Sequence, residues 1–168
     1  MSREEAWSAN EIEVTVSGFF TTHHRLEAPT GTMGEITMSG SGRKASFLGA
    51  DGRELALRQP KWWRNVYEVW EGDAELGAAW PQGFFSRQIV VEYGGRRYTL
   101  KPAGFWSRGW HLVDEVGNGL FEIKTRGLRR GARLGILAEI DIALLVFAYY
   151  LVHMRWQSEA AAAAASAY

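Results

Sequence analysis

Basic and aromatic side chains recur together in this sequence, and their types suit contact with an anionic surface. Pro-Lys-Trp-Trp-Arg at 60–64 returns as Pro-Gln-Gly-Phe-Phe-Ser-Arg at 81–87 and as Pro-Ala-Gly-Phe-Trp-Ser-Arg at 102–108. A weaker copy, Thr-Arg-Gly-Leu-Arg-Arg, occupies 125–130. Cationic groups attract anionic headgroups, and aromatic rings favour the boundary between lipid and water. The candidate binding residues are Lys61, Trp63, Arg64, Phe85, Arg87, Trp106, Arg108, Arg129 and Arg130.

The spacing of the copies indicates which elements position them. Pro60, Pro81 and Pro102 lie twenty-one residues apart. That interval is too short for a βαβ unit, which needs about thirty residues, and it fits two strands with two turns. Between the copies, apolar and polar residues alternate, as in 89–93, and tight Gly-containing turns such as the one at Gly94 reverse the chain. Each repeat unit is therefore predicted to be a β-hairpin.

Further strands are predicted outside the repeat. Apolar alternation indicates a strand at 11–17, and the segments 34–39 and 43–48 form a further strand pair. A last strand is expected at 132–138. The fold class predicted from this pattern is mainly β, an antiparallel closed barrel of about 10–12 strands around a buried C-terminal hydrophobic helix.

The predicted helix has no polar face. The run at 142–152 is apolar throughout, and Asp141 is suited to cap its N-terminus. Its eleven residues span roughly 16 Å, about half of a hydrocarbon core, and Glu139 and Arg155 lie just beyond it. A barrel closed around the helix is therefore favoured over a membrane anchor. His153 follows the run directly and is expected to cap the helix or to lie where it leaves the barrel.

The predicted organisation is a single barrel domain with short flanking segments. Residues 1–30 form an N-terminal extension with one strand, and 31–157 form the barrel with its core helix at 141–157. The Ala-rich tail at 158–168 either prolongs the helix outward or frays. A polar N-terminus predicts a cytoplasmic protein, peripheral at the inner face of the membrane if it contacts lipid.

Charge is balanced in total but separated along the chain. The formal net charge is zero, which argues against nucleic acid as a partner. The basic residues near the repeat copies are Arg58, Lys61, Arg64, Arg87, Lys101, Arg108, Lys124, Arg126, Arg129, Arg130 and Arg133, with no acidic residue in those stretches. The other turns carry Asp51, Glu54, Glu71, Asp73, Glu75, Glu92, Asp114, Glu115 and Glu122 against Arg53, Arg96 and Arg97.

In an up-and-down meander every second turn lies at the same end, so the repeat copies should form one basic aromatic rim. Two interpretations of this rim remain open. In the first, it contacts an anionic membrane. In the second, one aromatic side chain of each pair plugs the barrel end, and the arginines are merely solvated.

No enzyme is expected, because neither a catalytic group nor a cofactor site can be identified. The chain has no cysteine, and His23 and His24 would point to opposite faces of a strand, away from any common metal ion. The pattern at 40–45 resembles a dinucleotide-binding fingerprint, yet a strand follows it instead of the required helix. We predict no catalytic residue, no metal and no cofactor. The sequence does not specify an oligomeric state.

A hairpin meander with recurring Pro-aromatic turns, ending in the apolar segment 144–152, resembles the tubby-like superfamily over residues 31–157. This superfamily comprises tubby C-terminal domains, phospholipid scramblases and plant LURP-one-related proteins. The resemblance implies a twelve-stranded barrel threaded by a hydrophobic C-terminal helix, and it makes lipid association a candidate function. The Cys-rich segment and acidic calcium loop typical of scramblases are absent. The Lys and Arg pair with which tubby domains bind phosphoinositides matches no particular positions, so no site residue is transferred.

The expected function is a non-enzymatic, tubby-like binding module that contacts anionic lipid, or a similar headgroup, through the basic aromatic rim. Two alternatives stay open. The chain is either a cytoplasmic structural or protein-interaction module without lipid activity, or a tail-anchored membrane protein.

Overall fold

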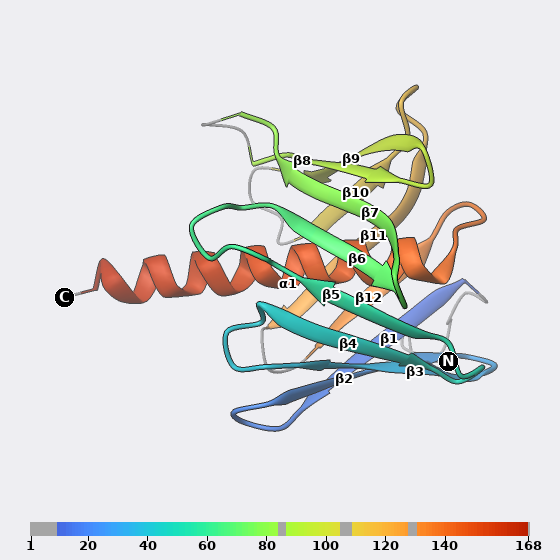
Figure 1. The fold of residues 1–168 in the computed structure, drawn as a ribbon, viewed down its shortest axis with the longest axis horizontal. Helices are drawn as coiled ribbons and strands as arrows, with labels where there is room; N and C mark the ends of the chain where they lie inside the picture. The colour runs from blue at the N-terminus through green and yellow to red at the C-terminus, as the bar shows by residue number, and fades with distance from the viewer. Residues whose placement is uncertain (1–9, 84–86, 105–108, 128–130, 168) are drawn as a thin grey trace, which may run out of the picture.

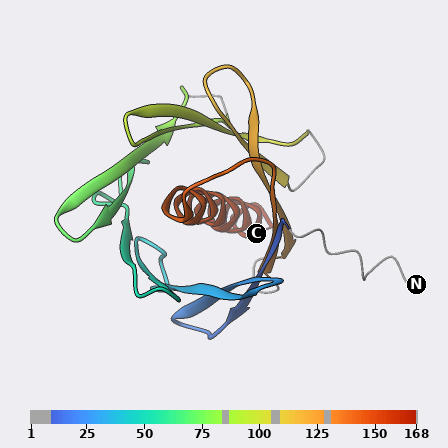
Figure 2. The same ribbon diagram turned by 90° about the vertical axis from the view of Figure 1, so that its right-hand side faces the viewer.

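The structure, a computed structural model, describes residues 10–83, 87–104, 109–127 and 131–167 (Figure 1). Twelve antiparallel strands form a closed barrel in chain order, and one C-terminal helix runs through it, as Figure 2 shows. This confirms the predicted fold class. The elements are β1 (Glu11–Ser17), β2 (Thr22–Ala28), β3 (Gly31–Met38), β4 (Lys44–Gly49), β5 (Glu54–Arg58), β6 (Tyr67–Glu71), β7 (Ala74–Pro81), β8 (Ile89–Tyr93), β9 (Arg96–Pro102), β10 (Gly109–Val113), β11 (Gly119–Gly127), β12 (Gly131–Ile136) and α1 (Ile142–Ala165).

The barrel closes between its first and last strands. Strand β1 pairs with β12, with Val14 opposite Ala132, so both strands lose the free edge that a sheet of this length would expose. Strands β1 and β2 are thus part of the barrel, which begins before residue 31, the start that the sequence predicts. Polar residues occupy most of β2, and one of its inward positions holds His24, so the segment lacks the apolar alternation that predicts a strand.

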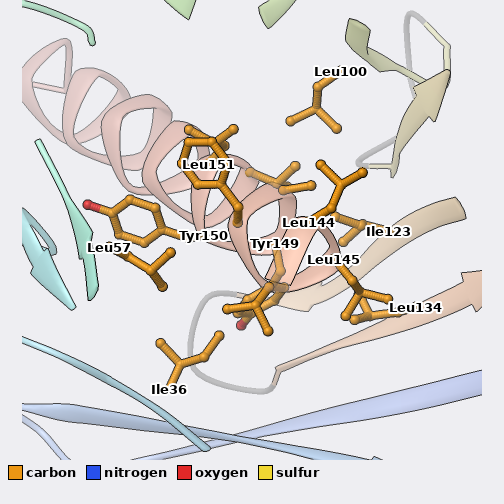
Figure 3. Close-up of a cluster of buried hydrophobic side chains, with 14 of the residues drawn as sticks. Ile36, Leu57, Leu100, Ile123, Leu134, Leu144, Leu145, Tyr149, Tyr150 and Leu151 are labelled. Atoms are coloured by element: carbon orange, nitrogen blue, oxygen red, sulfur yellow. The ribbon is translucent and has the colours of Figure 1, made fainter. Parts of the chain in front are cut away.

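Alternating strand residues point inward and meet a helix that is apolar on every side. In β4 and β5 every second side chain is buried, as the period of two requires. The helix is buried continuously from Ala143 to Met154, and no polar stripe interrupts this surface. Figure 3 shows the resulting core, in which strands and helix contribute Ile36, Leu57, Leu100, Ile123, Leu134, Leu144, Leu145, Tyr149, Tyr150 and Leu151.

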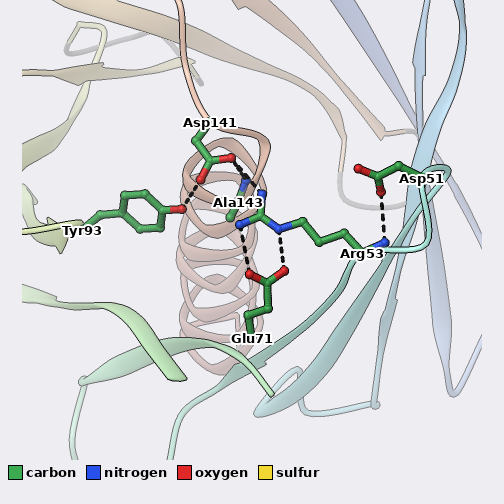
Figure 4. A network of polar contacts seen from close by, with 6 residues as sticks. All are labelled: Asp51, Arg53, Glu71, Tyr93, Asp141 and Ala143. Atoms are coloured by element: carbon green, nitrogen blue, oxygen red, sulfur yellow. Dashed lines mark hydrogen bonds and ion pairs between the residues drawn. The ribbon is translucent and has the colours of Figure 1, made fainter. Parts of the chain in front are cut away.

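The N-terminus of α1 is capped and tied to the barrel by a polar network (Figure 4). Asp141 is the predicted N-cap, and its carboxylate accepts a hydrogen bond from the backbone N–H of Ala143. Arg53 donates to this carboxylate at 2.9 Å and to Glu71 at 2.6 Å, while the hydroxyl of Tyr93 donates to Asp141. Partial burial opposes ionisation, but the hydrogen bonds from Tyr93 and Arg53 hold the pKa of Asp141 below its ordinary value.

The helix continues beyond the barrel, because the Ala-rich segment prolongs α1 to Ala165, one of the two outcomes expected for the tail. Alanine has the highest helix propensity, which favours this helical extension although its residues 158–165 are exposed. No helix in the described part of the chain combines the length and the apolarity that crossing a bilayer requires.

Gly131 sits at the seam where the barrel closes. Its φ of +92° lies in the left-handed region, and a Cβ atom built there would be 1.8 Å from the backbone oxygen of Val14. Gly52 has nearly the same φ, +91°, but a Cβ atom added to it would meet nothing within 4 Å. A side chain at Gly52 would therefore introduce backbone strain alone, whereas a side chain at Gly131 would introduce the same strain and also collide with β1.

We expect Gly52→Ala to lower the free energy of unfolding by about 1–2 kcal/mol, the cost of a left-handed non-glycine residue. Gly131→Ala should cost at least about 2 kcal/mol more, since β1 must also move away from β12. Urea denaturation of the two variants measures both losses. Equal losses would show that the β1–β12 seam tolerates a side chain.

Candidate functional site

The closed topology sorts the loops onto two ends of the barrel. Because neighbouring strands are antiparallel, the loops that follow the odd-numbered strands share one end, and α1 leaves the barrel there (Figure 1). We keep the name basic aromatic rim for these loops. The described residues of these loops are 18–21, 39–43, 59–66, 82–83, 87–88 and 103–104, while 84–86, 105–108 and 128–130 lie outside the described part of the chain. The repeat copy at 60–64 lies within this set, and the described parts of the other copies, 81–83, 87, 102–104 and 125–127, lie in it or in the strand ends that lead into it.

The loop between β5 and β6 presents two predicted aromatic residues to solvent. Trp62 is 68% exposed and Trp63 is 64% exposed, with their rings edge to face at a centroid distance of 5.9 Å. Neither ring plugs the barrel end, so the second interpretation of the rim fails for this pair. The buried side chain of Gln59 shapes the loop by donating a hydrogen bond to the carbonyl of Arg64 at 2.9 Å.

A further aromatic pair, which is not among the residues predicted from the sequence, lies on the same rim. Phe19 and Phe20, in the loop between β1 and β2, are 70% and 82% exposed. Every exposed aromatic side chain in the described part of the chain is therefore on this rim. A sequence signal did exist, because Gly18-Phe19-Phe20 repeats the Gly-aromatic-aromatic order of 83–85 and 104–106 without the preceding proline.

Part of the predicted basic charge is neutralised. Arg87 forms an ion pair with Glu159 of α1 at 2.7 Å, and Arg126 pairs with Glu13 of β1 at 2.6 Å. The repeat stretches contain no acidic residue, but closure of the barrel brings carboxylates to them from distant parts of the chain. These arginines are therefore less available to a ligand than the sequence indicates.

Two predicted cations on the β5–β6 loop keep their charge unpaired. Within the described residues, neither Lys61 nor Arg64 has a carboxylate at ion-pair distance, and both side chains are exposed. The ammonium group of Lys61 lies 5.8 Å from the ring centroid of Trp63. Of the other predicted site residues, Phe85, Trp106, Arg108, Arg129 and Arg130 lie outside the described residues.

Beneath the rim, the barrel interior holds a cluster of aromatic and imidazole rings. His24 of β2 shares a hydrogen bond of 2.7 Å with the hydroxyl of Tyr149, and its second ring nitrogen lies 2.9 Å from the hydroxyl of Thr22. The ring of His153 packs edge to face against that of His24 at a centroid distance of 4.7 Å. His153 is only 5% exposed, so the expectation that it caps or leaves the barrel is wrong.

Burial keeps both interior histidines neutral. Loss of hydration, reinforced by the neighbouring His153 and His23, lowers the pKa of His24 to about 3. Loss of hydration likewise lowers the pKa of His153 to about 4. His23, by contrast, points outward to Glu35 at 3.1 Å, as the alternation predicts. The described residues contain no group of three or more His, Asp or Glu side chains placed to hold a metal ion.

Comparison with solved structures identifies a similar fold. A protein from Arabidopsis thaliana superposes with a TM-score of 0.59 and 14% sequence identity, covering 86% of this chain and 91% of that chain. It too has a twelve-stranded barrel with a C-terminal helix. At this identity the likeness shows the fold alone. No protein-family model matches this sequence, and no curated protein matches it either.

The buried histidines predict acid sensitivity. The unfolded chain binds protons with a histidine pKa near 6.5, whereas the folded chain binds them only near 4 and below, so stability falls as the pH drops below about 6.5. Each of His24 and His153 should contribute a slope of up to about 1.4 kcal/mol per pH unit. Urea unfolding between about pH 6.5 and pH 5, above most carboxylate titrations, measures this slope.

His153→Phe should reduce that slope by about half, since one of the two groups no longer takes up a proton on unfolding. His111→Gln, on the outer face of β10, is the matched control and should leave the slope attributable to the buried pair unchanged. A flat profile in the unmodified protein would contradict the prediction.

Proposed function

We propose that this protein is a non-enzymatic, tubby-like module that contacts an anionic lipid surface through its basic aromatic rim. The observation that carries the proposal is the gathering of exposed aromatic pairs and unpaired cations at one end. Phe19, Phe20, Trp62 and Trp63 lie at the same end of the barrel as Lys61 and Arg64, on two loops that the barrel topology brings to this end. Exposed apolar surface of this kind marks interaction sites.

The magnitudes favour a membrane surface over a simple solvated rim. A cation near an anionic bilayer contributes about 1 kcal/mol, so Lys61 and Arg64 together contribute about 2 kcal/mol. Aromatic rings partition to the interface, and here they lie at the tips of loops from two different hairpins. Binding should therefore have a component that salt screens and a component that it does not.

The tubby-like assignment is part of this proposal. A twelve-stranded antiparallel barrel threaded by an apolar C-terminal helix is the architecture that the superfamily resemblance implies, and the Arabidopsis thaliana structure shares it. The fold does not specify a ligand, so the functional argument depends on the rim residues.

The test is co-sedimentation with vesicles of phosphatidylcholine, with and without phosphatidylserine. We expect binding that requires the anionic lipid and weakens at high salt. Lys61→Ser with Arg64→Ser should weaken binding about 30-fold, which corresponds to the loss of about 2 kcal/mol.

The matched control removes the same charge from the opposite end of the barrel. Arg96 and Arg97 begin β9, next to the turn at 94–95, away from the rim. Arg96→Ser with Arg97→Ser should bind vesicles like the unmodified protein. An equal loss in both double variants would mean that net charge, not the rim, governs binding, and no binding to anionic vesicles would favour a protein partner instead.

A further inference from the structure

A cleft of about 300 Å³ lies beside the basic aromatic rim, between two of its loops and the last buried turn of α1. The loop between β1 and β2 forms one wall, the loop between β3 and β4 a second, and the helix the floor. The lining residues that matter are Val16, Phe19, Phe20, Ser39, His153 and Gln157. The volume is at the small end of the range for small-molecule sites.

The floor of the cleft holds an imidazole without a hydrogen-bond partner. His153 packs against the rings of His24 and Tyr149, yet among the described residues it makes no hydrogen bond. Among the described residues, Nε of Arg43 is the one side-chain nitrogen or oxygen that both lacks a hydrogen-bond partner and is fully buried. The ring nitrogens of His153 also lack a partner in this part of the chain, so they are not fully buried and remain accessible to solvent. Since His153 lines the cleft, its free nitrogen is available there.

The neighbouring histidine behaves differently. Both nitrogens of His24 are engaged, one by Tyr149 at 2.7 Å and the other by Thr22 at 2.9 Å. The rings of His24 and His153 are in contact, but the two residues differ in their hydrogen bonding. His24 has both nitrogens bonded within the barrel, whereas His153 can still bond to a molecule in the cleft.

The walls of the cleft are held in place. The hydroxyl of Tyr150 donates to the carbonyl of Gly42 at 2.6 Å, which fastens the β3–β4 loop to the helix. Gly42 has a φ of +70°, and a Cβ atom there would lie 2.5 Å from the sulfur of Met154, so the loop packs directly on α1. A Cβ atom added to Gly40 would lie 3.2 Å from the backbone oxygen of Phe20, so the β3–β4 loop also packs closely against the β1–β2 loop.

The lining indicates the chemistry of the occupant. Among the described residues no charged side chain lines the cleft, and burial lowers the pKa of His153 to about 4, so its imidazole is neutral near pH 7. The polar groups are this imidazole, the amide of Gln157 and the hydroxyl of Ser39, and the apolar groups are Phe19, Phe20 and Val16. A charged ligand would lose its hydration without gaining a counter-charge.

We propose that the cleft binds a small uncharged amphiphile, whose hydroxyl hydrogen-bonds to His153 and whose apolar chain lies against Phe19 and Phe20. This site goes beyond the proposed function, because it needs neither the rim cations nor a membrane. A fatty alcohol or a short monoacylglycerol, free in solution, has this chemistry.

The experiment is a titration of the full chain with n-hexanol, without vesicles, followed by NMR of the histidine ring nitrogens. The ring signals of His153 should shift and saturate, while those of His111, on the outer face of the barrel, should stay in place. Hexanoate and hexylammonium, with the same chain length and opposite charges, should bind at least about tenfold more weakly.

Two sets of variants separate the possibilities. His153→Phe should weaken binding of n-hexanol about tenfold by removing the hydrogen bond. Should that variant not fold, Phe19→Ser with Phe20→Ser changes only exposed side chains and should weaken binding to a similar extent by removing the apolar wall. Lys61→Ser with Arg64→Ser should bind n-hexanol normally, so this site and the lipid contact of the rim can fail independently.

Three results would overturn the proposal. Shifts that do not saturate, or that are equal for all histidines, would indicate non-specific partitioning of the alcohol. Hexanoate binding as tightly as n-hexanol would contradict the uncharged class. Unchanged affinity in the Phe19 and Phe20 double variant would place the alcohol outside the cleft.

Discussion

The burial of α1 inside the barrel is the interaction on which the rest of the structure depends. Neither part is stable alone, because the helix is apolar on every side and the inward faces of twelve strands would otherwise surround a void. Polar contacts at both ends then set the position of the helix along the barrel. Arg53 and Tyr93 hold the carboxylate of Asp141 at its start, and the hydroxyl of Tyr150 reaches the carbonyl of Gly42 near the other end.

Closure around the helix also determines where functional side chains can gather. Because neighbouring strands are antiparallel throughout, loops that follow odd-numbered strands lie at one end of the barrel and loops that follow even-numbered strands lie at the other. This holds however far apart the loops are in the sequence. This is why Phe19 and Trp63, more than forty positions apart in the sequence, stand on the same rim. Pairing of β1 with β12 likewise brings Glu13 to Arg126 of β11, so part of the basic charge is neutralised.

Much of the fold can be predicted from the sequence, because hairpins and an apolar helix leave local patterns. Period-two alternation and the twenty-one-residue repeat predict most strands, and the run at 142–152 predicts the core helix with its cap at Asp141. Strand β2 is missed, because an inward histidine breaks the apolar pattern. The depth of His153 is misjudged, because burial of a polar ring depends on how far the barrel extends along the helix. The cleft depends on packing between two loops and α1, which no local pattern records.

The closing pair of strands has a consequence for how the chain acquires its structure. Val14 cannot pair until Ala132 has been synthesised, and the segment that fills the centre is synthesised after every strand. Contacts between residues so distant in sequence make folding slow, because the entropy of closing a long loop must be lost before the contact forms. During synthesis the emerging hairpins therefore expose their inward apolar faces until α1 is available to fill the barrel, and surface of this kind promotes aggregation.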